Sequence, residues 1–149
     1  MISTNTFRKI KPIIFLAIIA PSFLWTFQLI NGSLGVNPIE KLMDNLGEMG
    51  LRLIIATLLI SSLSEFKKLR FLIDIRRMIG LFAFFYVSCH FLTYIALDHF
   101  FDISFIIKDI LKRPFITFGF LSFVFLIPLV ITSPKKILKK LGYNLWKKI

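Results

Sequence analysis

His90 is the residue of this sequence whose type and position most clearly suggest chemistry. It lies within an apolar run of 19 residues, from Ile79 to Leu97, which is long enough to cross a bilayer as a helix. An imidazole at that depth is costly without a partner, so it is a candidate functional residue. It could ligate a haem iron through a neutral ring nitrogen, or hydrogen-bond to a neighbouring helix and hold two helices together. The spacing alone leaves both interpretations open.

Residues three, four or seven positions from His90 would share its helix face. They are Ala83, Tyr86, Val87, Thr93, Tyr94 and Leu97. Among these, Tyr86 and Tyr94 offer hydroxyls for haem propionates or for the imidazole itself. Ala83 and Gly80 are small, and we expect them to leave room for a flat macrocycle. The second histidine, His99, is nine residues further along, or about 14 Å by helical rise, and could not bind the opposite face of the same iron.

Two arginines are weaker candidates. Glu48 and Arg52 are four apart, which favours an ion pair along one helix. The alternative is that Arg52 faces a haem propionate or a quinone head group. Arg77 stands at the start of the run that contains His90, where a basic residue is explained by membrane topology alone. A flavin phosphate or a propionate is the alternative partner of Arg77, and nothing local separates the two.

The elements that would position these residues are membrane helices. The chain has 149 residues, of which 56% are hydrophobic. Four nearly uncharged blocks predict membrane-spanning helices at residues 12–30, 47–63, 79–97 and 115–131. A soluble helix bundle would show a polar stripe on each helix, and the last two blocks carry no charge on any face. We also expect a polar arm before residue 12 and amphipathic segments at residues 39–46 and 103–111.

Charge distribution predicts the topology. Three basic residues precede the first block, five lie between the second and third, and six follow the fourth, whereas the other two connections carry one and three. The positive-inside rule then places both termini and a basic tail, residues 132–149, in the cytoplasm. Because topology explains the alternation, the net charge of +11 does not indicate nucleic-acid binding. The single cysteine, Cys89, excludes a Cys-x-x-Cys-His attachment site, so a haem would be held non-covalently.

Several short strings occur in an order and spacing that resemble the MsrQ (YedZ) family. They are Asn37-Pro38-Ile39-Glu40, Gly50-Leu51-Arg52, Arg76-Arg77-Met78-Ile79-Gly80-Leu81, Phe85-Tyr86 with His90 and Tyr94, Lys112-Arg113-Pro114-Phe115-Ile116-Thr117-Phe118-Gly119, Thr132-Ser133, Leu141-Gly142 and Trp146. Each string is weak by itself, but together they cover nearly the whole chain. The family is the haem-binding membrane subunit of the bacterial periplasmic methionine sulfoxide reductase system. It belongs to the ferric-reductase-like transmembrane group.

The resemblance implies a function. Such a subunit of the bacterial inner membrane takes electrons from the quinone pool or a cytoplasmic flavin reductase. It passes them through haem b to a periplasmic molybdenum-containing subunit that repairs oxidised envelope proteins, and it is not itself the catalyst. His90 falls on the family's haem ligand in the third helix. The resemblance also allows an FMN cofactor, and therefore a flavoprotein.

The resemblance departs from the family at the C-terminus. The family continues into two further helices with more ligating histidines, so we expect a single ferric-reductase-like domain over residues 1–149 that lacks its last two helices. The alternative function is a truncated or non-redox membrane scaffold that binds no cofactor.

Overall fold

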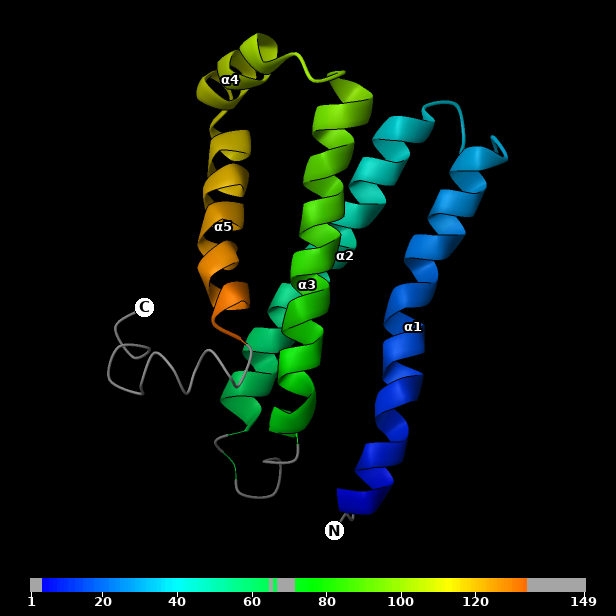
Figure 1. Ribbon diagram of the computed structural model, residues 1–149, viewed down its shortest axis with the longest axis vertical. Coiled ribbons are helices and arrows are strands. Elements are labelled where there is room, and N and C mark those ends of the chain that lie inside the picture. The colour runs from blue at the N-terminus through cyan, green and yellow to red at the C-terminus, as the bar shows by residue number, and fades with distance from the viewer. Residues whose placement is uncertain (1–3, 65, 67–71, 134–149) are drawn as a thin grey trace. The chain divides into compact units, whose positions relative to one another are not determined.

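A computed structural model describes residues 4–64, 66 and 72–133. The described residues form two compact parts, one ending at Phe101 and the other beginning at Asp102. The first part contains α1 (Thr4–Ile30), α2 (Pro38–Leu63), α3 (Ile73–Thr93) and the π-helix η2 (Tyr94–Asp98), and the second contains α4 (Ile103–Lys112) and α5 (Pro114–Ile131) (Figure 1). The prediction of one domain over residues 1–149 stays a prediction.

Four apolar segments are long enough to cross a membrane within the described residues. They are Ile10–Ile30, Pro38–Leu63, Ile75–Asp98 and Pro114–Ile131. The described chain contains helices and connections but no strand. The predicted all-α membrane protein with four membrane-spanning helices is therefore confirmed. The predicted basic tail lies outside the described residues except for Thr132 and Ser133.

The first three helices begin earlier than their apolar blocks. The expected polar arm is already helical from Thr4, and the expected segment at residues 39–46 is continuous with α2, whose first residue is Pro38. Arg76 and Arg77 lie inside α3 instead of before it. The physical reason is that an apolar block marks the length that fits the hydrocarbon, whereas a helix can continue into the interface. Proline also favours the first helical position of α2.

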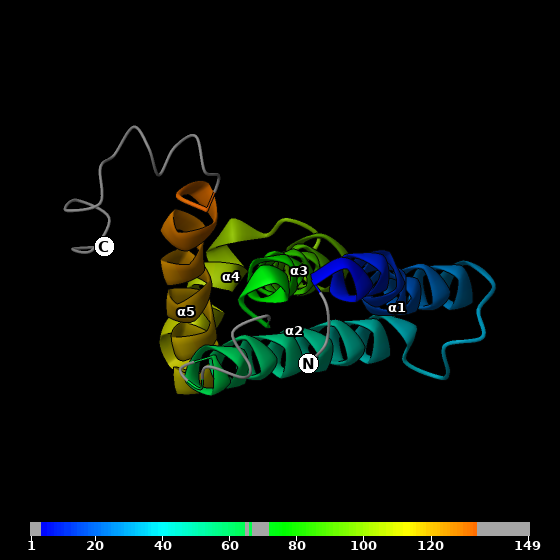
Figure 2. The ribbon, with the colours of Figure 1, turned by 90° about the horizontal axis from the view of Figure 1, so that it is seen from below.

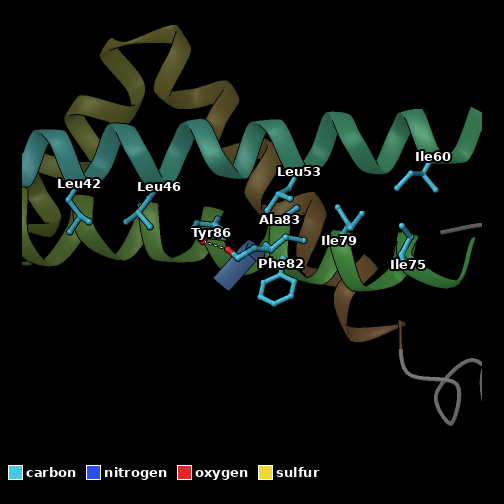
Figure 3. Close-up of a cluster of buried hydrophobic side chains, with 10 residues drawn as sticks. Leu42, Leu46, Leu53, Ile60, Ile75, Ile79, Phe82, Ala83 and Tyr86 are labelled. Atoms are coloured by element: carbon cyan, nitrogen blue, oxygen red, sulfur yellow. Dashed lines mark hydrogen bonds between the residues drawn. The ribbon is translucent and has the colours of Figure 1, made fainter. Parts of the chain in front are cut away.

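The core of the first part lies between α2 and α3, which pack side by side (Figure 3). Buried aliphatic side chains fill the space between them, with Leu42, Leu46, Leu53 and Ile60 from α2 and Ile75, Ile79 and Ala83 from α3. A Cβ at Gly50 would lie 2.8 Å from Cγ2 of Val87. Small residues let membrane helices approach closely, and Gly50 does so here.

The remaining helix of the first part, α1, is joined to α3 by aromatic contacts and a hydrogen bond. Phe15 packs against Phe82 with ring centroids 5.0 Å apart, and Trp25 lies 6.2 Å from Tyr86. The Tyr86 hydroxyl donates to the carbonyl oxygen of Ile18 over 2.5 Å, which Figure 3 marks with a dashed line. Figure 2 views the helices from below. Together, α1, α2 and α3 bury the Tyr86 side chain completely.

The second part is a short amphipathic helix followed by an apolar one. The Asp102 side chain accepts a hydrogen bond from the Phe105 N–H and so caps the start of α4. Arg113 adopts an extended conformation between the two helices, and Pro114 begins α5. The Thr117 hydroxyl donates to the Ile110 carbonyl and links α5 back to α4. The expected amphipathic segment at residues 103–111 is confirmed as a helix.

Candidate haem-ligating site

His90 lies on α3, and its half-buried ring reaches across to α2. Its Nδ1 is 2.8 Å from the carbonyl oxygen of Met43. That carbonyl lies near the start of α2, inside the segment that continues the helix beyond its predicted apolar block. The imidazole therefore bridges two helices through a bond between residues that are 47 apart in sequence.

This contact fixes which ring nitrogen carries the proton. A carbonyl oxygen can only accept a hydrogen bond, so Nδ1 must be protonated and donate. In a neutral imidazole the other nitrogen, Nε2, then keeps its lone pair. Histidine metal ligands commonly donate their second ring N–H to a carbonyl or carboxylate in this way, which orients the ring and fixes its tautomer. A ligand role for Nε2 of His90 is compatible with this arrangement and stays a prediction.

Gly47 makes this arrangement possible. A Cβ placed on Gly47 would lie 2.9 Å from Nδ1 of His90 and 3.1 Å from Cε1. The ring edge thus occupies the space that a side chain would fill, one turn along α2 from the Met43 carbonyl. The signal in the sequence is a glycine inside an apolar helix, which is unfavourable unless close packing requires it. Sequence reasoning placed Gly47 at the start of a helix and missed its contact with His90.

The small residues near His90 differ in their surroundings. Ala83 is 2% exposed within the core between α2 and α3, where α2 occupies the space that we expected for a macrocycle. Gly80 is half-buried, and a Cβ on it would make an ordinary contact, 3.7 Å from Cγ2 of Thr57. Room for a macrocycle at Gly80 stays a prediction.

The two predicted tyrosines point to different partners. Tyr86 donates its hydroxyl to Ile18 of α1, so the hydroxyl is engaged in holding helices together. Tyr94 is 9% exposed and lies edge-on to His99, with ring centroids 4.4 Å apart. The π-helical hydrogen bond from the His99 N–H to the Tyr94 carbonyl brings residues five apart together. The roles of both tyrosines towards a haem stay predictions.

The arginines lie on exposed faces. Arg52 pairs with Glu48 over 2.5 Å, with the two side chains 67% and 60% exposed. The sequence favoured this ion pair over a haem or quinone contact for Arg52, and the structure contains the pair. Arg77 is exposed near the start of α3. A role for either arginine beside a haem or a flavin stays a prediction.

Comparison with known proteins shows the family of this chain. Residues 46–149 match the family described as ferric reductase like transmembrane component, which includes the segment bearing His90 and Gly47. A protein-methionine-sulfoxide reductase heme-binding subunit MsrQ from Herminiimonas arsenicoxydans is 44% identical over 93% of this chain and 63% of its own length. The subunit of the same name from Ralstonia nicotianae is 35% identical over 99% of this chain and 68% of its own length. The chain belongs to the MsrQ family.

MsrQ relatives are longer than this chain. A third one, from Caulobacter vibrioides, is 44% identical over 92% of this chain and 65% of its own length. The chain thus spans somewhat less than two thirds of the first relatives it matches. No solved structure matches it.

Proposed function

We propose that this chain is a haem-bearing electron-transfer subunit of the bacterial inner membrane. The observation that carries the proposal is the His90 ring, whose Nδ1 is bound to the Met43 carbonyl so that Nε2 is left as a ligand. Membership of the MsrQ family and the four apolar helices support it. Because the only cysteine is Cys89, the haem would be non-covalent, as in haem b.

The residues of this chain would hold the haem as follows. His90 presents Nε2 to the iron, the Met43 carbonyl fixes the ring, and Gly47 leaves space for it. A single imidazole suits an iron whose equatorial ligands come from a macrocycle. Haem supplies one-electron transfer when bound. His99 lies beyond the π-helical turn and packs on Tyr94, so we expect the described chain to offer one histidine ligand at membrane depth.

The partners follow from the family. The relatives are named as subunits of a protein-methionine-sulfoxide reductase, so we infer a periplasmic molybdenum-containing catalytic subunit as the electron acceptor. The proposed donors are the quinone pool or a cytoplasmic flavin reductase, with FMN as a further cofactor. Arg52, Arg77, Tyr86 and Tyr94 are proposed as the surroundings of the haem or flavin. The chain would then transfer electrons without catalysing sulfoxide reduction.

A non-redox scaffold is the second candidate, and one observation favours it. The bond from His90 to the Met43 carbonyl satisfies the imidazole without any metal and joins α2 to α3. The same geometry therefore also fits a histidine whose task is helix packing. The two functions differ in whether Nε2 binds iron.

The absorption spectrum of the purified full-length chain separates the two functions. We expect a haem spectrum that is substoichiometric or high-spin, because His90 is the one histidine of the described residues that would hold a haem at membrane depth. His90→Ala should abolish it, and the control His99→Ala should leave it unchanged. Coexpression with the remaining C-terminal part of the Herminiimonas arsenicoxydans relative should give a low-spin spectrum that depends on His90. Haem bound equally by wild type and His90→Ala would overturn the proposal, and a haem-free chain under both conditions would favour the scaffold.

A further inference from the structure

The helix α4 carries two exposed ridges of opposite character. One ridge is apolar and consists of Ile103, Ile107 and Leu111, which are 68%, 52% and 77% exposed and follow one another at steps of four. The adjacent ridge consists of Ser104, Lys108 and Lys112, which are also exposed. Steps of four place residues along one side of a helix. An exposed apolar side next to a cationic side is the pattern of a helix that lies in a membrane interface.

The third side of α4 packs within the second part of the chain. It carries Asp109, the only acidic residue of α4, which is buried. Ile106 and Asp109 are each 7% exposed. Asp109 pairs with Arg113 over 2.9 Å, and the Ile110 carbonyl accepts the hydroxyl of Thr117 from α5. The negative charge of Asp109 is therefore buried and compensated. What α4 presents outward is positive and apolar.

The chain itself places α4 at the bilayer surface. The helix ends at Lys112, and the apolar helix α5, long enough to cross a membrane, begins at Pro114. A single residue, Arg113, separates the two. Figure 1 shows α4 lying across the end of α5 instead of extending its axis. If α5 crosses the bilayer, α4 lies along the surface of that bilayer at the level of the head groups.

A hollow on α4 has the chemistry of a lipid phosphate site. It has a volume of about 760 Å³ and is lined by Phe105, Lys108, Asp109, Leu111, Lys112 and Arg113. Within the described residues, neither lysine has an ion-pair partner. Lysine stems can lie along apolar surface while their ammonium groups reach the head groups. Basic side chains at this level attract anionic phospholipids.

We propose that α4 is an interfacial helix that binds an anionic phospholipid of the surrounding bilayer. The apolar ridge Ile103, Ile107 and Leu111 inserts among the acyl chains, and Lys108 and Lys112 bind the lipid phosphate. This inference depends on α5 crossing the membrane, in either orientation, and not on haem binding. The competing occupant of the apolar ridge is protein, either another helix of a longer chain or a partner subunit.

Spin labelling of the full chain in vesicles shows whether lipid, protein or water surrounds the apolar ridge of α4. Cys89→Ala removes the only cysteine, and Ile107→Cys or Lys108→Cys then introduces a single label site. In vesicles of phosphatidylcholine and phosphatidylglycerol, the label at position 107 should be more accessible to oxygen than to a water-soluble nickel complex. The label at position 108 should show the reverse. High nickel accessibility at position 107 would mean that the ridge is in water, and low accessibility to both would mean that protein covers it; either result overturns the proposal.

A variant that removes charge tests the head-group contact and needs no introduced cysteine. Native mass spectrometry of the full chain, extracted from mixed vesicles, measures retained phosphatidylglycerol relative to phosphatidylcholine. Lys108→Gln with Lys112→Gln should lower this ratio about tenfold, because two cations near the surface are lost. The control Lys11→Gln with Lys41→Gln removes the same charge elsewhere and should keep the ratio. Equal ratios in both double variants would show that α4 does not select anionic lipid.

Discussion

At the scale of single residues, the state of His90 depends on Gly47. The ring edge lies where a side chain at position 47 would be, and this close approach lets Nδ1 reach Met43. A histidine at membrane depth is thereby satisfied on one nitrogen and left with a lone pair on the other. The orientation of the His90 ring therefore depends on the Met43 carbonyl and on the absence of a side chain at Gly47, as well as on the imidazole itself.

Gly47→Ala should therefore weaken both the helix pair and haem retention. The new methyl group would displace the ring and break the 2.8 Å bond to Met43, which we expect to cost about 1–3 kcal/mol of stability, as overpacking does. Thermal unfolding and the haem absorbance measure the two effects. Gly119→Ala is the matched control, since a Cβ there meets nothing within 4 Å. That control should gain up to about 1 kcal/mol, as alanine does over glycine in a helix. If Gly47→Ala behaves like the control, His90 does not depend on this contact.

Arg52 can be tested against its own partner. The ion pair with Glu48 is exposed and spans one turn, so losing it should cost no more than about 0.5 kcal/mol. If the pair is the whole role of Arg52, then Arg52→Ala and Glu48→Ala should both keep the haem content and reduction potential of the wild type. Loss of haem, or a shifted potential, in Arg52→Ala alone would instead place the guanidinium beside a propionate.

At the scale of elements, α1 is attached to α3 through Tyr86. Its buried side chain packs against Trp25 and donates its hydroxyl to the carbonyl oxygen of Ile18, and both of these residues belong to α1. In a medium without water, such a bond has few alternatives. Tyr86 thus makes both a ring contact and a polar contact with α1, beside the Phe15–Phe82 ring contact between the same two helices.

Tyr86→Phe should loosen α1 without changing the ring packing. The loss of the hydroxyl should lower stability by about 0.5–1.5 kcal/mol, the usual net value of one hydrogen bond. Thermal unfolding in detergent measures this change. Thr26→Val is the control, because the Thr26 hydroxyl is exposed and bonds only to the Ser22 carbonyl of its own helix. Equal stability of Tyr86→Phe and wild type would show that aromatic packing alone holds α1.

At the scale of the whole molecule, the alternating charge of the connections predicts the orientation in the membrane. A reporter that is active only in the periplasm should be active when fused after Val36, and inactive when fused after Phe66 or Ile149. Reporter activity in the fusion after Phe66 would show that the topology is the inverse of the predicted one. Such an inversion would place α4 at the cytoplasmic surface while leaving its proposed lipid contacts intact.

The sequence by itself determined the membrane class, the four apolar spans and the amphipathic character of residues 103–111, and it marked His90 as the candidate residue. These follow from composition and local spacing, which act over one helix. It also pointed to the Glu48–Arg52 pair, because residues four apart meet on any helix.

Only the tertiary structure decided which ring nitrogen of His90 is free, and why. Helical spacing gives the face on which a residue lies, but not what it meets there. The His90 bond spans 47 residues and the Tyr86 bond spans 68, so both depend on the register between helices. That register is set where Gly47 and Gly50 let α3 approach α2. The same close packing fills the space that Ala83 suggested for a macrocycle, because a small residue leaves room that a neighbouring helix can occupy as readily as a cofactor.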